Sequence, residues 1–221
     1  MIRDVDISEI WDGRFYTASD LVKADTMDCK GCSDCCRTMT DTILLDPWDI
    51  RQMKQVTGLD FDRLLEKHIT LTVADGLITP VMAMAEDGAC TFLDGNGRCT
   101  IHTSRPGFCR LFPLGRYYDD GGDFRYFLQA KECPKPRVKT RVSKWLGIDD
   151  LPRYEEYVRQ WHAFIKQVQH LIDGESEKLQ KQVCLYLVQL FYRRDWEEEP
   201  GFYEQFEQRL ARARKDLSLA G

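Results

Sequence analysis

The chain has 221 residues, of which 43% are hydrophobic and 30% are charged, a balance typical of an ordinary soluble globular protein. Its net charge of −5 argues against non-specific binding to nucleic acid or to an anionic membrane. The N-terminus lacks the basic start and apolar run of a signal peptide, and no apolar stretch reaches transmembrane length. We therefore expect a cytoplasmic protein with neither nucleic acid nor a membrane as its partner.

The first regular elements that the sequence predicts strongly are two short helices. Before them, the chain suits only a short helix or an arm packed on the core, followed by a cysteine-rich loop. Asp46 can cap a helix that Pro47 begins and Gly58 ends, with Asp49 favouring the first turn. Asp60 repeats this pattern for a second helix, which follows at once.

The middle of the chain, residues 78–130, predicts a small antiparallel sheet. Short apolar runs alternate there with the turn signals EDG, DGNG and DDGG. The remainder predicts three amphipathic helices separated by glycine and proline, over residues 154–172, 177–196 and 201–217. The expected fold class is α+β. Residues 1–148 would form a loop-rich cysteine domain with the sheet and short helices, and residues 149–221 a helical C-terminal extension packed on it.

The cysteines are the strongest functional signal. Thiols stay reduced in the cytoplasm, so dense cysteines there favour metal or cluster ligation over disulfides. The run CKGCSDCC begins with the C-x2-C-x2-C spacing of bacterial ferredoxins, which also suits zinc knuckles. Eight of the nine cysteines lie in the first 133 residues. The predicted metal ligands are Cys29, Cys32, Cys35, Cys36, Cys90, Cys99, Cys109 and Cys133.

Other side chains near these cysteines have assignable roles. Adjacent residues of an extended chain point to opposite sides, so Cys35 and Cys36 are expected to serve different sites, or one of them to stay a free thiol. Arg105 and Arg110 are predicted to stabilise thiolates or an anionic substrate as cofactor-binding residues. His102 could be a ligand, but a structural or supporting role is favoured. Cys184 lies mid-helix among apolar residues and is predicted to be buried in the core.

With these residues in hand, the chain resembles the YkgJ family of cysteine-cluster proteins, also called the CxxCxxCC domain. The resemblance covers roughly residues 29–133 and includes CKGCSDCC and the later block CTFLDGNGRCTIHTSRPGFCRLFPL. It implies a zinc- or iron-chelating domain, and the family is often labelled as iron–sulfur. A related branch includes a flagellin lysine methylase that uses such a cluster. His102 stands where the family usually has tyrosine, which leaves room for a local change in ligation.

Three functions remain open at this point. The first is a cytoplasmic protein with a [4Fe–4S] cluster and a redox or cluster-dependent modification role, as an oxidoreductase or a transferase. The second is a structural zinc module with two four-cysteine sites, whose helices bind a protein partner. The third is an enzyme like the lysine methylase, although no glycine-rich nucleotide-binding fingerprint is found. The metal, the sharing of thiols between sites and any substrate are not determined by the sequence.

Overall fold

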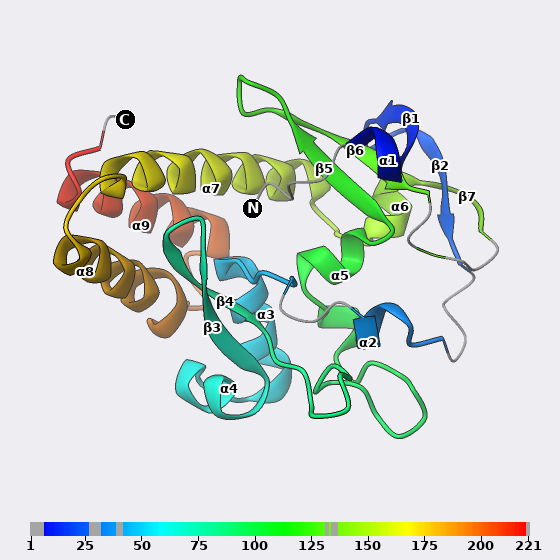
Figure 1. Ribbon diagram of the computed structural model, residues 1–221, viewed down its shortest axis with the longest axis horizontal. Helices are drawn as coiled ribbons and strands as arrows, with labels where there is room; N and C mark the ends of the chain where they lie inside the picture. Colours follow the sequence, from blue (N-terminus) through cyan, green and yellow to red (C-terminus); the bar gives the residue numbers. More distant parts are fainter. Residues whose placement is uncertain (1–6, 27–31, 39–41, 131–132, 134–136, 220–221) are drawn as a thin grey trace.

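The computed structural model describes residues 7–26, 32–38, 42–130, 133 and 137–219. Helices and small antiparallel sheets share this part of the chain, so the predicted α+β class is confirmed. In Figure 1 the long helices α7 (Leu151–Ile172), α8 (Glu177–Leu187) and α9 (Phe202–Asp216) occupy the left, and a three-stranded sheet lies at the upper right. None of the helices in the described ranges is long and apolar enough to cross a membrane.

The N-terminal segment begins with a short helix, one of the two expected forms, and then contributes two strands that were not expected. Helix α1 (Ile7–Ile10) lasts only four residues before β1 (Trp11–Tyr16), and β2 (Leu21–Asp25) follows. Strand β1 joins a sheet with β6 (Phe124–Gln129) and β5 (Leu114–Tyr118), in the order β1-β6-β5. Strand β2 pairs with β7 (Val138–Arg141). Most of β1 faces solvent, so its sequence lacks the alternation of apolar and polar residues that identifies a half-buried strand.

The two predicted short helices are present. In α3 (Pro47–Thr57) the Asp46 side chain accepts from the Asp49 N–H at 2.9 Å, and the Asp49 side chain accepts from the Asp46 N–H at 3.1 Å. This reciprocal capping satisfies backbone donors that a helix start leaves free. Helix α4 (Phe61–Lys67) begins after Asp60, as expected.

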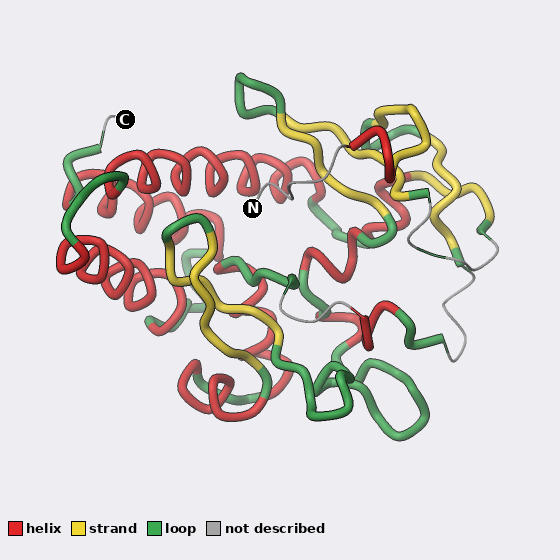
Figure 2. The backbone as a smooth tube through the Cα atoms, viewed as in Figure 1, coloured by secondary structure: helices red, strands yellow, loops and turns green. Residues whose placement is uncertain are grey.

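The predicted sheet over residues 78–130 is split into separate hairpins. Strands β3 (Ile69–Ala74) and β4 (Leu77–Met82) form the first, which begins earlier than expected. The DDGG signal does connect β5 (Leu114–Tyr118) to β6 (Phe124–Gln129). The EDG and DGNG signals instead lie in a long loop held by two isolated β-bridges, Met84 to Cys90 and Leu93 to Cys99. Figure 2 shows this loop at the lower right.

The C-terminal region is helical, as its periodicity predicts. After α6 (Val142–Leu146) come α7 (Leu151–Ile172), α8 (Glu177–Leu187) with a π-helical end (η2, Val188–Arg193), and α9 (Phe202–Asp216). Helix α7 packs on α3 through an aromatic contact, with the ring centroids of Trp48 and Tyr154 5.1 Å apart. One core cluster contains residues from both segments of the chain. The division into domains at residue 148 stays a prediction.

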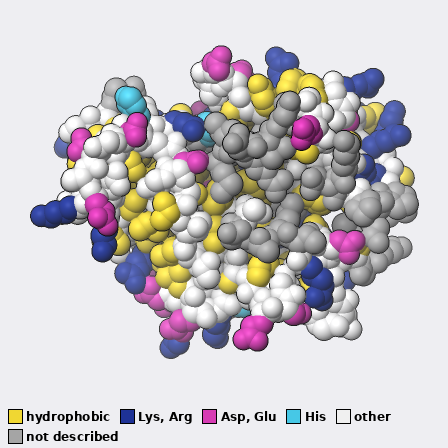
Figure 3. Space-filling view, viewed as in Figure 1, with side chains coloured by type: hydrophobic (Ala, Val, Ile, Leu, Met, Phe, Trp, Pro, Cys, Tyr) yellow, Lys and Arg dark blue, Asp and Glu magenta, His cyan; other side chains and the backbone are white. Residues whose placement is uncertain are grey.

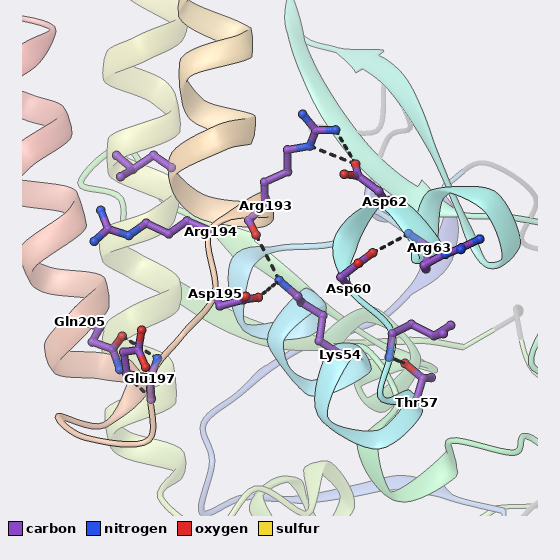
Figure 4. Close-up of polar contacts among 12 residues, drawn as sticks. Lys54, Thr57, Asp60, Asp62, Arg63, Arg193, Arg194, Asp195, Glu197 and Gln205 are labelled. Atoms are coloured by element: carbon purple, nitrogen blue, oxygen red, sulfur yellow. Dashed lines mark hydrogen bonds and ion pairs between the residues drawn. The ribbon is translucent and has the colours of Figure 1, made fainter.

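Polar contacts also join the last helices to α3 and α4. Figure 4 shows Lys54 pointing towards Asp195 and the Arg193 carbonyl, and Arg193 pointing towards Asp62. Because Asp62 and Asp195 are largely exposed, these ion pairs add little stability. They mainly fix the orientation of the paired side chains at the surface. On the face in Figure 3, hydrophobic side chains gather over the β3–β4 hairpin, where Val73 and Leu71 are exposed.

Candidate metal centre

Three separate segments bring five of the predicted cysteines together. Helix α2 (Cys35–Thr38) carries Cys35 and Cys36, the long loop carries Cys90 and Cys99, and α5 (Gly107–Leu111) carries Cys109. The Cys90 N–H donates to the Cys36 carbonyl at 2.8 Å, which ties the loop to α2. In Figure 1, α2 lies above this loop and below α5. We call these residues the five-cysteine cluster.

The thiols of this cluster influence one another electrostatically. The Cys36 thiol donates a hydrogen bond to Cys35, which lowers the pKa of Cys35 to about 7 and raises that of Cys36. Burial raises the pKa of Cys109, and the nearby Cys90 and Cys99 thiols raise it further. Without a cation, this crowding of ionisable sulfurs opposes the formation of several thiolates. A bound metal would reverse that preference, because thiolates are its ligands.

Two copies of one local turn present Cys90 and Cys99. In the first, the Phe92 N–H donates to the Cys90 sulfur, and the Leu93 N–H donates to the Cys90 carbonyl at 2.9 Å. In the second, the Ile101 N–H donates to the Cys99 sulfur, and the His102 N–H donates to the Cys99 carbonyl at 3.3 Å. Backbone N–H groups aimed at sulfur stabilise the ionised thiolate. Both turns are therefore suited to hold a ligand cysteine.

Within the described part of the chain, the positive charge of Arg105 acts on two thiols of the cluster, Cys35 and Cys99. Burial raises the pKa of Cys99, and the positive charge of Arg105 partly offsets that effect. Its Nη1 contacts the ring of His102, 3.1 Å from Nδ1. Its Nε is buried and makes no hydrogen bond to the described residues. A thiolate, or a sulfur ligand of a bound metal, would supply the acceptor that this N–H group needs.

Arg110 is directed elsewhere. Its Nε donates to the Arg105 carbonyl at 3.1 Å, and another guanidinium nitrogen donates to the Thr103 carbonyl. A third donates to the carbonyls of Leu146 and Gly147, at 3.5 Å each. Arg110 therefore fastens α5 to the short 3₁₀ helix η1 (His102–Ser104) and to the end of α6. These hydrogen bonds all go to backbone carbonyls and do not test its predicted role towards a cofactor. That role stays a prediction.

The remaining predicted ligands have different positions. Cys29 lies outside the described residues. Cys32 and Cys133 are half-buried free thiols, and the contacts that define the five-cysteine cluster do not include them. Cys184 is 3% exposed, and its sulfur lies 3.5 Å from the Ile78 nitrogen, which confirms the prediction of a core residue.

The cluster fits a thiolate-bound metal in its chemistry. Within the described ranges, no three Cys, His, Asp or Glu side chains stand in an arrangement that could already hold an ion. The donor set nevertheless consists of convergent sulfurs, N–H groups aimed at two of them, and an arginine Nε without an acceptor. Such a set suits soft, thiophilic metals such as zinc or iron–sulfur clusters.

One residue near the cluster was not identified from the sequence as part of the site. Asp49 was assigned only to the first turn of α3, yet its side chain also accepts the Gly107 N–H of α5 at 2.7 Å. It is 1% exposed. No sequence signal identifies this second contact, because it joins residues 58 positions apart.

Comparison with known families agrees with this geometry. Residues 28–134 match the family model named CxxCxxCC, described as a "Putative zinc- or iron-chelating domain". The protein carries a CxxCxxCC domain. This domain contains all five members of the cluster, together with Cys29, Cys32 and Cys133. Its description is compatible with either zinc or an iron–sulfur cofactor. No curated protein and no solved structure gives a significant match to the chain.

Proposed function

We propose that the CxxCxxCC domain binds a [4Fe–4S] cluster through cysteine thiolates and serves a redox or cluster-dependent modification role in the cytoplasm. The observation that carries the proposal is the convergence of five cysteines from α2, the long loop and α5 beside Arg105. The C-x2-C-x2-C run, which ends at Cys35, favours a cluster over a single ion because it has ferredoxin spacing.

The chain's own residues supply three conditions for such a group. The Phe92 and Ile101 N–H groups hold the sulfurs of Cys90 and Cys99 in a fixed direction. The Cys109 side chain is half-buried, which partly limits access of water and oxidants to one side of the site. Four thiolates and an oxidised cluster core leave a net charge of about −2, which Arg105 would partly neutralise. When bound, an iron–sulfur cluster supplies one-electron transfer.

Metal analysis tests this proposal directly. The protein would be purified without oxygen, and its iron, acid-labile sulfide and zinc would be measured together with its visible absorbance. We expect a brown protein with iron and sulfide in equal amounts. Cys109→Ser should lose most of both, whereas Cys184→Ala, which changes a core thiol outside the cluster, should retain them. Protein that holds neither iron nor zinc under these conditions would refute metal binding.

Structural zinc is the second candidate, and one feature of the fold favours it. The chain between β4 and α5 is held by isolated β-bridges and turns, without a strand ladder of its own. A zinc ion would fasten this loop to α2 and supply folding energy. Colourless protein with stoichiometric zinc, whose circular dichroism changes on chelation, would support this candidate. In that case the C-terminal helices would bind a protein partner.

A further inference from the structure

Helix α5 carries Cys109 but cannot fix its own position. It has five residues, and a helix this short gains little stability from its own backbone hydrogen bonds. The residue at its N-cap is Pro106, whose side chain makes no capping hydrogen bond. Proline has no side-chain oxygen that could accept a hydrogen bond from the N–H groups at a helix start. The orientation of α5 must therefore come from contacts with other elements.

A carboxylate from α3 supplies the missing cap. The Oδ1 atom of Asp49 accepts the Gly107 N–H at 2.7 Å, and its Oδ2 atom accepts the Asp46 N–H at 3.1 Å. One buried side chain thus caps the starts of two helices. A backbone N–H left unpaired in the interior is unfavourable, so the contact with Gly107 resists movement of α5.

Close packing reinforces this anchor at Gly107. A Cβ atom at this position would lie 2.5 Å from the Tyr154 hydroxyl and 3.6 Å from Asp49 Oδ1. Tyr154 is fully buried, and its hydroxyl accepts from Arg116 at 3.3 Å. The start of α5 is therefore seated against α3 and α7, while Arg110 fastens its other end. Cys109 lies between these two anchors.

We propose that Asp49 is a positioning residue of the metal centre, which holds the Cys109 thiol in place by capping α5. The inference rests on the proposed function, since it assigns Asp49 a role towards the cysteine cluster. Asp49 lies outside the cysteine pattern in sequence and acts through Gly107. It sets the distance between the α5 ligand and the ligands from α2 and the long loop.

Cysteine alkylation in metal-free protein tests the anchor without depending on metal. Asp49→Ala removes both accepted hydrogen bonds, and we expect the alkylation rate of Cys109 to rise about tenfold or more. The rate at Cys184, which only global opening exposes, should stay within about twofold of wild type. Asp49→Asn retains an oxygen for the Gly107 N–H but loses the second acceptor, and should give an intermediate rate. Asp60→Ala removes the cap of α4 without touching α5, and is the matched control.

The same variants would then be reconstituted with iron and sulfide, and separately with zinc, with bound metal and absorbance as readouts. Asp49→Ala should bind less than half the metal of wild type, Asp49→Asn should recover most of it, and Asp60→Ala should match wild type. Unchanged Cys109 alkylation and metal content in Asp49→Ala would overturn the positioning role, and so would a parallel rise at Cys109 and Cys184. If wild type itself takes up no metal, the proposed function fails, and the alkylation result separately reports whether Asp49 anchors α5.

Discussion

The contact between Gly107 and Tyr154 gives the sharpest test of how α5 is seated. In Gly107→Ala the new methyl group would lie 2.5 Å from the Tyr154 hydroxyl, closer than real Cβ atoms approach a neighbour. Tyr154 is fully buried, and it is flanked by Trp48 and by Arg116. Because the Tyr154 side chain is enclosed by these neighbours, it cannot move away from the new methyl group. The backbone of α5 has to shift instead.

The magnitude follows from the packing. Extra methyl groups in a tight core cost about 1–3 kcal/mol, and the rigid surroundings favour the upper half of that range. For a protein of this size, each 1 kcal/mol lowers Tm by about 2–4 °C, so a fall of about 4–12 °C is expected. Tyr154→Phe removes the hydroxyl and leaves the nearest ring atom, Cζ, at 3.8 Å from the methyl position. In that background Gly107→Ala should cost less than about 1 kcal/mol.

A double-mutant cycle provides the assay. The free energy of unfolding in urea would be measured for wild type, both single variants and the double variant. Gly107→Ala should cost about 1–2 kcal/mol less in the Tyr154→Phe background than in wild type. Gly95→Ala is the control, because its Cβ would meet nothing within 4 Å and its backbone is not left-handed. Equal stability of Gly107→Ala and wild type, or additive effects in the double variant, would refute the proposed close contact.

Two further predictions concern residues outside the cluster. Cys184→Ala removes a buried sulfur and should lower the free energy of unfolding by about 1 kcal/mol in urea titrations; loss of bound metal in this variant would contradict its assignment to the core. Burial lowers the pKa of His162, which stacks on Tyr118, to about 4. The unfolded chain, with a His pKa near 6.5, then binds more protons between pH 4 and 6.5, so stability should fall as pH drops through this window. In His162→Gln the fall in the urea midpoint between pH 7 and pH 5 should be smaller, and an identical fall would show that His162 does not contribute.

Short-range signals in the sequence determined several elements of this protein. Asp46 and Gly58 bound α3 because capping depends on atoms within a few residues of the helix ends. The periodicity of the last third predicts α7, α8 and α9 because one apolar stripe must face the core. The cysteine spacing indicates metal chemistry for the same kind of reason, since neighbouring thiols can approach one ion without help from the rest of the fold.

The tertiary structure alone decided which distant residues meet. Strand β1 pairs with β6, more than 100 residues later, and its exposed sequence carries no signal of that partner. The gathering of Cys36, Cys90 and Cys109, and the second hydrogen bond of Asp49, likewise join segments far apart in the chain. Such contacts form only when the whole core closes, because each must repay the entropy of a long loop. A local pattern records what one segment prefers, whereas the packing of all segments selects its neighbours.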